Sequence, residues 1–313
     1  MLLADIGGTN ARFALLYGGQ IEPMEQVAVA DCPDPITAIV DFLTRHKGDG
    51  PISGALLGVA GTVDRGRCRV TNSSWTLDTE VLQSKFGFGT VRLVNDFEAL
   101  AWSVPRLTSA DFFPLRSGRT VADAPKLIVG PGTGFGASCL LKHGDSPFAL
   151  ASEAGHATLP AMSQDGAKVI DILRNRFGHA STERALSGPG IENLYQALAT
   201  VAGVAPQPRD AAAITTAALQ GSCALSKAAL DMFCAILGTV TGNLALAFCA
   251  RGGIYIGGGV VPRFPEYLRS SQFGACYEEM GRFRRYLREI PVNVITRPDA
   301  TFVGLRAMLE HEA

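Results

Sequence analysis

The chain has 313 residues, of which 47% are hydrophobic and 18% charged, and its formal net charge is −1. This length allows two domains of ordinary size, the composition is typical of a globular protein, and the near-neutral charge gives no electrostatic case for nucleic acid. The seven cysteines form no Cys-x-x-Cys pair, which argues against a zinc knuckle or a redox pair. Because the few residues before Asp5 are too short for a secretory signal, we expect reduced thiols and a cytoplasmic protein.

The first informative stretch is an apolar strand, a Gly-Gly turn and a second apolar strand. Glycines permit such a tight turn, and its N–H groups can form a nest for phosphate oxygens. Asp5 would repel phosphate unless a cation lay between them, so the stretch predicts a site for a Mg²⁺-bound polyphosphate. An ordinary hairpin with a buried Asp5 is the alternative. The candidate phosphate-binding residues are Asp5, Gly7, Gly8, Thr9, Asn10 and Arg12.

Further strands and a first helix follow this hairpin. Asp34 and Pro35 predict a helix with Asp34 as N-cap and Pro35 at its first position, ended by Lys47-Gly48. A polar loop over residues 72–75 contains Asn72, which could hydrogen-bond a ligand or simply end a turn. The strands that we expect here cover residues 21–29, 54–59 and 67–71.

The next candidate lies where a strand meets a helix. After a short helix capped by Asp78, a strand over 91–94 runs directly into Asn95 and Asp96. In α/β folds such a junction lies at the carboxyl edge of the sheet, where ligands bind. Asp96 is therefore either a helix N-cap or a general base that takes a proton from an attacking hydroxyl.

The opening pattern returns beyond an irregular segment over 105–124, near whose start we expect a domain boundary. A strand over 126–129, a glycine turn and a return strand over 135–141 repeat the first hairpin. Two such hairpins favour a duplicated architecture that grips one polyphosphate from both sides, although no Gly-Lys-Ser/Thr follows as in a Walker motif. The turn residues that we single out are Gly132, Thr133 and Gly134.

Two polar residues in the middle of the chain are candidates for a polyol site, and a further acid follows them. Glu153 and His156 stand three apart in a glycine-containing loop, where a carboxylate and an imidazole could bind adjacent hydroxyls. The alternative is an acid exposed to solvent beside a histidine whose hydrogen bonds are made within the protein. We discount a metal site. Ser181-Thr182-Glu183-Arg184 begins a predicted helix that stops at Gly188-Pro189-Gly190. Glu183 lies in its first turn, where an acid commonly interacts favourably with the helix dipole.

The last third of the chain is predominantly apolar. The uncharged segment 232–250 is long enough to span a membrane, but its polar and small residues favour a buried core helix. A final helix over 301–310, with Thr301 as N-cap, is expected to pack on the first domain. A strand over 253–256 ends in three glycines that would let a flat ring or a ribose approach the backbone, namely Gly257, Gly258 and Gly259.

These motifs, in the order in which they occur along the chain, resemble those of the bacterial glucokinases that lack a repressor domain. These glucokinases belong to the hexokinase–actin–heat-shock ATPase superfamily. The resemblance covers nearly the whole chain, and the Cys-rich zinc motif of the related repressor–kinase family is absent. The motifs that carry it are Leu3-Ala4-Asp5-Ile6-Gly7-Gly8-Thr9-Asn10-Ala11-Arg12, Leu93-Val94-Asn95-Asp96-Phe97, Gly130-Pro131-Gly132-Thr133-Gly134-Phe135-Gly136, Ser152-Glu153-Ala154-Gly155-His156, Glu183-Arg184-Ala185-Leu186-Ser187-Gly188-Pro189-Gly190 and Ile256-Gly257-Gly258-Gly259.

The resemblance implies an α/β protein with a two-domain actin-like ATPase (ribonuclease H-like) fold, a mixed sheet in each domain and a cleft between them. The small domain would comprise residues 1–106 joined by the C-terminal helix 300–313, and the large domain residues 107–299. The implied ligands are ATP, Mg²⁺ and a hexose, with Asp5 near Mg²⁺ through water. The two phosphate loops would contain Asp5 to Arg12 and Gly132 to Gly134, and Gly257 to Gly259 would border the adenosine.

The residues implied to bind the hexose are Asn72, Asn95, Asp96, Glu153, His156 and Glu183, with Asp96 as the base. The implied reaction transfers the γ-phosphoryl of ATP to the 6-hydroxyl of D-glucose, giving glucose 6-phosphate and ADP. A kinase for mannose, fructose or an N-acetylhexosamine, a non-catalytic sugar-sensing protein, and a filament or chaperone ATPase are the alternatives. A homodimer without nucleic-acid or membrane partners is expected.

Overall fold

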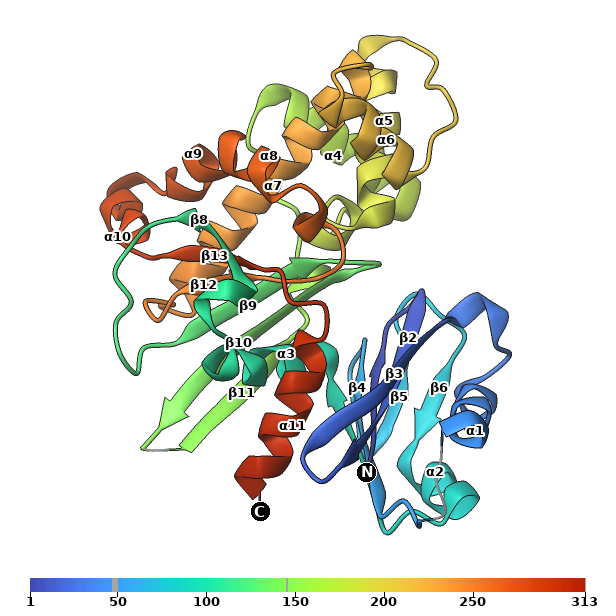
Figure 1. Cartoon of the computed structure of the whole chain (residues 1–313). Coiled ribbons are helices and arrows are strands. Elements are labelled where there is room, and N and C mark those ends of the chain that lie inside the picture. The colour runs from blue at the N-terminus through green and yellow to red at the C-terminus, as the bar shows by residue number, and fades with distance from the viewer. Residues whose placement is uncertain (47–49, 145, 313) are drawn as a thin grey trace. The chain divides into compact units, whose positions relative to one another are not determined.

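The computed structural model describes residues 1–46, 50–144 and 146–312. Its chain divides into two compact units, coloured by residue number in Figure 1. Unit 1 comprises Met1–Ser109, Phe148–Ala151 and Arg297–Ala313, and unit 2 comprises Ala110–Pro147 and Ser152–Thr296. The expected α/β organisation with mixed sheets is confirmed, whereas the domain limits expected at 106/107 and 299/300 stay a prediction.

Unit 1 is built on a five-stranded mixed sheet with the order β3-β2-β1-β4-β7. The first three strands form an antiparallel meander, and β4 and β7 run parallel to β1. The strand expected over 67–71 is shorter than predicted and pairs with β6 in a separate ribbon. The strands are β1 (Leu2–Ile6), β2 (Asn10–Tyr17), β3 (Gln20–Ala28), β4 (Gly54–Val59), β5 (Arg67–Arg69), β6 (Thr76–Asp78) and β7 (Thr90–Asn95).

Helices cover both faces of this sheet. On one face α1 (Pro35–His46) packs through Phe42 against Phe13 of β2, with ring centroids 5.6 Å apart. The predicted N-cap is confirmed, because the Asp34 carboxylate accepts from the Thr37 N–H at 2.9 Å. The predicted end at Lys47-Gly48 lies outside the described residues. The predicted cap of α2 (Thr79–Phe86) by Asp78 is also confirmed.

The other face carries α3 (Asp96–Ser103) and α11 (Ala300–Glu312), which lie side by side in Figure 1. Phe302 and Leu305 of α11 are buried with Leu3 of β1, so the prediction that the last helix packs on the first part of the chain is confirmed. The helices approach closely because Gly304 has no side chain: a Cβ there would collide with the Ala99 carbonyl oxygen. Because α11 begins before residue 301, the predicted role of Thr301 as N-cap is wrong.

A six-stranded mixed sheet with the order β11-β10-β9-β12-β13-β8 belongs to unit 2, except that Phe148–Ala151 of its edge strand β11 are grouped with unit 1. The expectation that 105–124 is irregular is wrong in part, because β8 lies within it. This strand pairs antiparallel with β13 at the edge of the sheet, where Pro114 is tolerated despite its missing N–H. The strands are β8 (Phe112–Arg116), β9 (Lys126–Pro131), β10 (Phe135–His143), β11 (Ser146–Ser152), β12 (Ile254–Ile256) and β13 (Val292–Ile295).

The helices of unit 2 group around the long helix α7, which packs against α5, α6 and α9. By length and composition α7 could cross a membrane, yet residues such as Phe233 and Leu237 are fully buried in the core, as the sequence predicted. The helices are α4 (Gln164–Phe177), α5 (Gly188–Ala202), α6 (Ala211–Leu219), α7 (Ala224–Ala247), α8 (Pro265–Ser270), α9 (Phe273–Glu278) and α10 (Arg284–Arg288).

One predicted boundary in unit 2 is reversed. The segment Thr182–Arg184 forms only a 3₁₀ turn, and Gly188-Pro189-Gly190 begins α5 instead of ending a helix. Ser187 is the N-cap and accepts from the Gly190 N–H at 2.9 Å. Proline fits there because the first turn of a helix has no intrahelical use for its N–H.

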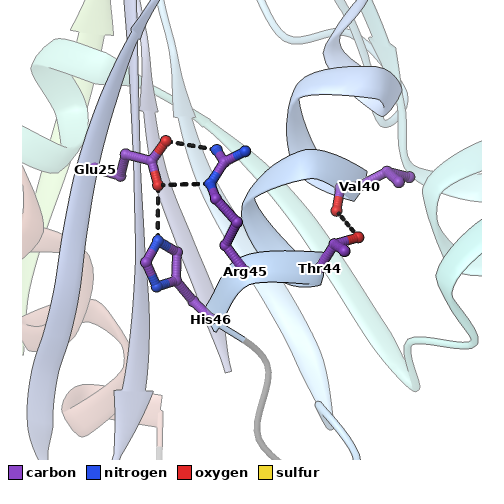
Figure 2. A network of polar contacts seen from close by, with 5 residues as sticks. All are labelled: Glu25, Val40, Thr44, Arg45 and His46. Carbon is purple, nitrogen blue, oxygen red and sulfur yellow. Dashed lines mark hydrogen bonds and ion pairs between the residues drawn. The ribbon is translucent and has the colours of Figure 1, made fainter.

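A carboxylate on β3 connects the sheet of unit 1 to the end of α1 (Figure 2). Glu25 pairs with Arg45 Nη2 through Oε1 at 2.5 Å and with His46 Nε2 through Oε2 at 2.7 Å. The hydrogen bond from Arg45 contributes most to lowering the pKa of Glu25 below its ordinary value, and the hydrogen bond from His46 lowers it further. The contact therefore holds β3 against α1 while the Glu25 carboxylate is ionised. Figure 2 also shows the Thr44 hydroxyl donating to the Val40 carbonyl at 2.7 Å within α1.

Glu25→Gln should lower stability at neutral pH by up to about 1 kcal/mol, the upper range for a partly exposed ion pair. Since the pKa is depressed in the folded state, this contribution is complete above the unfolded glutamate pKa of about 4.3 and is lost as the pH falls through the folded pKa. Urea unfolding at pH 7 and near pH 3 measures it. Asp41→Asn, at an exposed position of α1, is the control. A Glu25→Gln deficit equal at both pH values would contradict the assignment.

Gly304→Ala should destabilise the packing of α11 on α3, because the added methyl group would overlap the Ala99 carbonyl oxygen. We expect a loss of about 1–3 kcal/mol in the free energy of unfolding, typical of overpacking. Urea denaturation at pH 7 checks it, with Gly50→Ala as control because a Cβ at Gly50 meets nothing within 4 Å. Equal stability of the two variants would show that α11 does not depend on this close approach.

Candidate functional site

The first glycine turn is fixed by backbone hydrogen bonds to two neighbouring segments of unit 1. It connects β1 to β2, and the register of these strands pairs Asp5 with Arg12. A turn anchored in this way keeps its polar groups in place before a ligand arrives. The bonds run from the Gly7 N–H to the Asn10 carbonyl (2.9 Å), from the Ala60 N–H to the Ile6 carbonyl (2.8 Å) and from the Val29 N–H to the Thr9 carbonyl (2.9 Å).

Asn72 lies directly beside this turn. A Cβ on Gly8 would stand 2.6 Å from the Thr71 carbonyl oxygen and 3.3 Å from Asn72 Cβ. Only glycine permits so close an approach of the two loops. Asn72 itself has φ 61°, the left-handed conformation that asparagine tolerates better than most residues. The candidate residues Gly8 and Asn72, far apart in sequence, are therefore neighbours.

The carboxylate of Asp5 is held from two directions. Arg12 Nη1 contacts Asp5 Oδ2 at 3.1 Å, and the Thr301 side chain at the start of α11 also hydrogen-bonds Asp5. Burial nevertheless raises the pKa of Asp5, and these two partners oppose the rise only in part. A desolvated carboxylate of this kind favours a further positive charge nearby.

Asn95 and Glu98 form a capping box around Asp96. Asn95 Oδ1 accepts from the N–H groups of Phe97 (3.0 Å) and Glu98 (3.2 Å), and the Glu98 carboxylate accepts in return from the Asn95 backbone. Burial raises the pKa of Glu98. The N-cap of α3 is therefore Asn95, and the interpretation of Asp96 as N-cap is wrong. Asp96 is the first helical residue, and its Oδ1 accepts from the Phe97 N–H at 3.0 Å.

The turn of β1–β2 and the start of α3 belong to one edge of the sheet. The parallel registers align Ile6 with Val59 and Val59 with Asn95. The carboxyl ends of β1, β4 and β7 therefore coincide, which is where α/β sheets bind ligands. Asn95 adds a direct tie along this edge, because its Nδ2 donates to the Gly61 carbonyl at 3.3 Å.

In unit 2 the second and third glycine turns pack backbone against backbone. A Cβ on Gly130 would collide with the Gly257 carbonyl oxygen, and Gly258, at φ 80°, lies against the Pro131 carbonyl. The Val260 N–H also donates to the Pro131 carbonyl at 3.2 Å. The structure therefore brings together the two sets of candidate nucleotide residues in this unit, which are Gly132 to Gly134 and Gly257 to Gly259.

The N-terminus of α5 abuts the second glycine turn. The Gly188 N–H donates to the Gly132 carbonyl at 2.8 Å, and the Gly132 N–H donates to the Gly134 carbonyl at the same distance. The positive end of the helix dipole therefore lies at the turn, an arrangement that favours anions. The sequence does not reveal this arrangement, because Gly188-Pro189-Gly190 is equally typical of a helix end.

The three candidate sugar-binding residues of unit 2 gather around Phe135, the first residue after the second glycine turn. Glu183 Oε2 accepts from the Phe135 N–H at 3.0 Å. Gly155 fits against the Phe135 carbonyl, where a Cβ would collide. On either side of Gly155 stand Glu153 and His156, whose Oε2 and Nε2 are 3.7 Å apart, with about half of each side chain exposed. Glu183 therefore stabilises the second hairpin through its hydrogen bond to Phe135, and it does not lie in the first turn of an α-helix.

Sequence reasoning missed four supporting residues in unit 1 and at the second turn. Nothing local distinguishes Gln26, which contacts Arg12 and Asn10, or Thr301, which contacts Asp5. Glu98 had a usable signal, because Asn-x-x-Glu after a strand matches a capping box. Ser187 had one as well, because it precedes glycine and proline at a helix start.

Comparisons with known proteins bear on the whole chain. The family model described as glucokinase matches residues 2–312. A glucokinase of Paramagnetospirillum magneticum is 40% identical over 312 residues, covering 99% of this chain and 97% of its own length. A glucokinase crystal structure from an Antarctic psychrotroph has a TM-score of 0.83 at 36% identity, covering 99% of this chain and 98% of that one.

A more distant structure shares the fold. It is a ROK family glucokinase of Streptomyces griseus, solved in complex with glucose and AMPPNP, with a TM-score of 0.66 at 19% identity and coverage of 98% of both chains. The family resemblance inferred from the motifs is thus confirmed along essentially the full length of the sequence. This chain belongs to the glucokinase family.

Proposed function

We propose that this chain transfers the γ-phosphoryl of ATP to the 6-hydroxyl of D-glucose, giving glucose 6-phosphate and ADP, with Asp96 as the general base. Its family makes it an ATP-dependent sugar kinase, and the roles of individual residues are the proposed part. The observation that carries the proposal is the capping box of Asn95 and Glu98, which fixes Asp96 at the edge of the sheet that also carries the Gly7-Gly8 turn.

Phosphoryl transfer requires positioning and charge neutralisation more than covalent chemistry from the protein. In this proposal the backbone donors of the glycine turns and the Arg12 guanidinium bind phosphate oxygens. Asp96 accepts the proton of the attacking hydroxyl as the new bond forms, a role worth about 10²–10⁴ in rate. The turns are the candidate sites named above, with Thr9, Asn10 and Thr133 adding side-chain donors.

Asp5 fits a Mg²⁺ ion through water. Oxygen ligands are those that Mg²⁺ prefers, and it usually keeps several waters with one or two carboxylates. Burial raises the pKa of Asp5 although Arg12 and Thr301 contact it, so a nearby cation would stabilise the ionised form. Among residues 1–46, 50–144 and 146–312 no cluster of three His, Cys, Asp or Glu could hold a metal alone. The nucleotide would therefore supply further ligands. Mg²⁺, when bound, neutralises charge on the β- and γ-phosphates.

The hexose would be bound by carboxylate, amide and imidazole groups, which suit a ring of hydroxyls. Glu153 and His156 are partly exposed and adjacent, and Glu183 stands beside them through Phe135. Asn72, Asn95 and Asp96 supply the corresponding groups of unit 1. The glucose and AMPPNP bound to the Streptomyces griseus protein support a hexose and a nucleotide as ligands. A homodimer in the cytoplasm remains part of the proposal, supported by the family resemblance.

Asp96→Asn should lower kcat by about 10²–10⁴ while leaving glucose affinity within a few-fold, because an amide keeps the shape and loses the basic oxygen. A coupled assay with MgATP measures kcat, and glucose-induced protection against thermal unfolding measures binding. Asp31→Asn, at an exposed position of the same unit, should behave like the parent. A kcat of Asp96→Asn near the parent value would refute the assignment of the base.

Substrate choice is tested with the unaltered protein. A panel of glucose, mannose, fructose and N-acetylhexosamines, each with MgATP, should give its highest kcat/KM for glucose. Product identification should place the phosphate on the 6-hydroxyl. Higher kcat/KM with another hexose would replace glucose as the substrate, and formation of no sugar phosphate at all would overturn the proposed reaction.

A further inference from the structure

The side chain of Gln26 on β3 bridges two residues of the first glycine hairpin. The register of the meander aligns Asp5 with Arg12 and Arg12 with Gln26, so the three side chains form a row across three strands on one face of the sheet. Gln26 Oε1 accepts from Arg12 Nε at 2.9 Å, and Gln26 Nε2 donates to Asn10 Oδ1 at 3.2 Å.

The polarity of this chain of hydrogen bonds is set by Arg12. A guanidinium only donates, so Gln26 must present its oxygen to Arg12 and its NH₂ group to Asn10. Asn10 must then present its oxygen to Gln26, which leaves its own NH₂ group as the donor on the side of the turn. A phosphate oxygen accepts and never donates when ionised, so this orientation of Asn10 is the one that suits a phosphate.

Arg12 is fixed at both ends of its planar group. Nε is held by Gln26, and Nη1 contacts Asp5 at 3.1 Å. Glu25, the neighbour of Gln26, faces the opposite side of the sheet and pairs with Arg45 and His46 of α1 (Figure 2). Glu25 therefore ties β3 to α1 on one face of the sheet, directly beside the position where Gln26 contacts the hairpin on the other face.

We propose that Gln26 is a positioning residue for the nucleotide phosphates, acting through the amide orientation of Asn10 and the guanidinium of Arg12. The inference rests on the proposed function, because it assumes that the first glycine turn binds the phosphates of ATP. Gln26 does not itself touch the nucleotide. It determines that the NH₂ group of the Asn10 amide, and not its oxygen, is directed to the phosphates.

Two substitutions separate positioning from mere packing. Gln26→Leu removes both contacts and should raise KM for ATP about 3–10-fold, the loss expected for one hydrogen bond, with kcat and KM for glucose within about twofold. Gln26→Glu keeps the shape and the bond to Arg12, but a carboxylate cannot donate to Asn10. Asn10 would turn its NH₂ group to the new carboxylate and its oxygen to the phosphates. Gln26→Glu should therefore also raise KM for ATP while its thermal midpoint stays within a few degrees of the parent.

Asn10→Ala and the double variant Asn10→Ala/Gln26→Leu test the route of the effect. Asn10→Ala alone should raise KM for ATP by a similar factor. Adding Gln26→Leu should then increase KM further by less than the single Gln26→Leu change does, because the shared path is already lost. Gln20→Leu, the same substitution at an exposed position of the same strand, is the matched control and should match the parent.

The outcomes distinguish the inference from the proposed function. If Asn10→Ala raises KM for ATP while both Gln26 variants leave it unchanged, the positioning role of Gln26 is overturned and the assignment of the turn stands. If Asn10→Ala leaves KM for ATP unchanged in an enzyme that still phosphorylates glucose, the phosphates are not bound through Asn10. The positioning role of Gln26 is then overturned, while the proposed reaction stands. Fully additive effects in the double variant would overturn the route through Asn10.

Discussion

A largely buried carboxylate, Asp5, connects distant parts of unit 1. Burial raises the pKa of Asp5, and two partners from distant parts of the chain reduce that cost without removing it. Arg12 comes from the neighbouring strand, and Thr301 comes from a helix almost three hundred residues later in the sequence. An acid in this condition is stabilised by a nearby cation, and in the proposed function that cation is the magnesium ion bound with the nucleotide. The close approach of Gly8 to Asn72 places a candidate hexose-binding residue beside the same turn.

Each unit uses the absence of side chains to bring polar backbone together. In unit 2, Gly130, Gly155 and Gly258 all sit where a Cβ would strike a carbonyl group. Their contacts join the second glycine turn to the Gly257 turn and to the loop of Glu153 and His156. The N-terminus of α5 adds a dipole at the same turn. Backbone groups fixed by neighbouring segments lose little entropy when an anion binds, which is a general route to preorganisation.

Much of this fold and site was predictable because its signals are local. Glycine turns between apolar strands, and Asp34 and Asp78 before helices, specify structure within a few residues. Three failures have identifiable causes. Asn95 and Asp96 are both good caps, and only the reciprocal bond of Glu98 selects the first. The strand β8 contains a proline and pairs with β13, far along the chain. The role of Gln26 depends on a register between three strands, which no short window of sequence contains.

The dependence of unit 1 on residues 297–313 has a consequence for biosynthesis. Leu3, Ala14 and Ala99 are covered by Phe302 and Leu305 of α11, and Asp5 receives its contact from Thr301 only when that helix is in place. While the ribosome is still translating the middle of the chain, the segment 1–109 carries an uncovered apolar face and an incompletely supported acid. Nascent chains therefore reach the end of translation with their first third incompletely packed, and the uncovered apolar face is prone to aggregation during that interval.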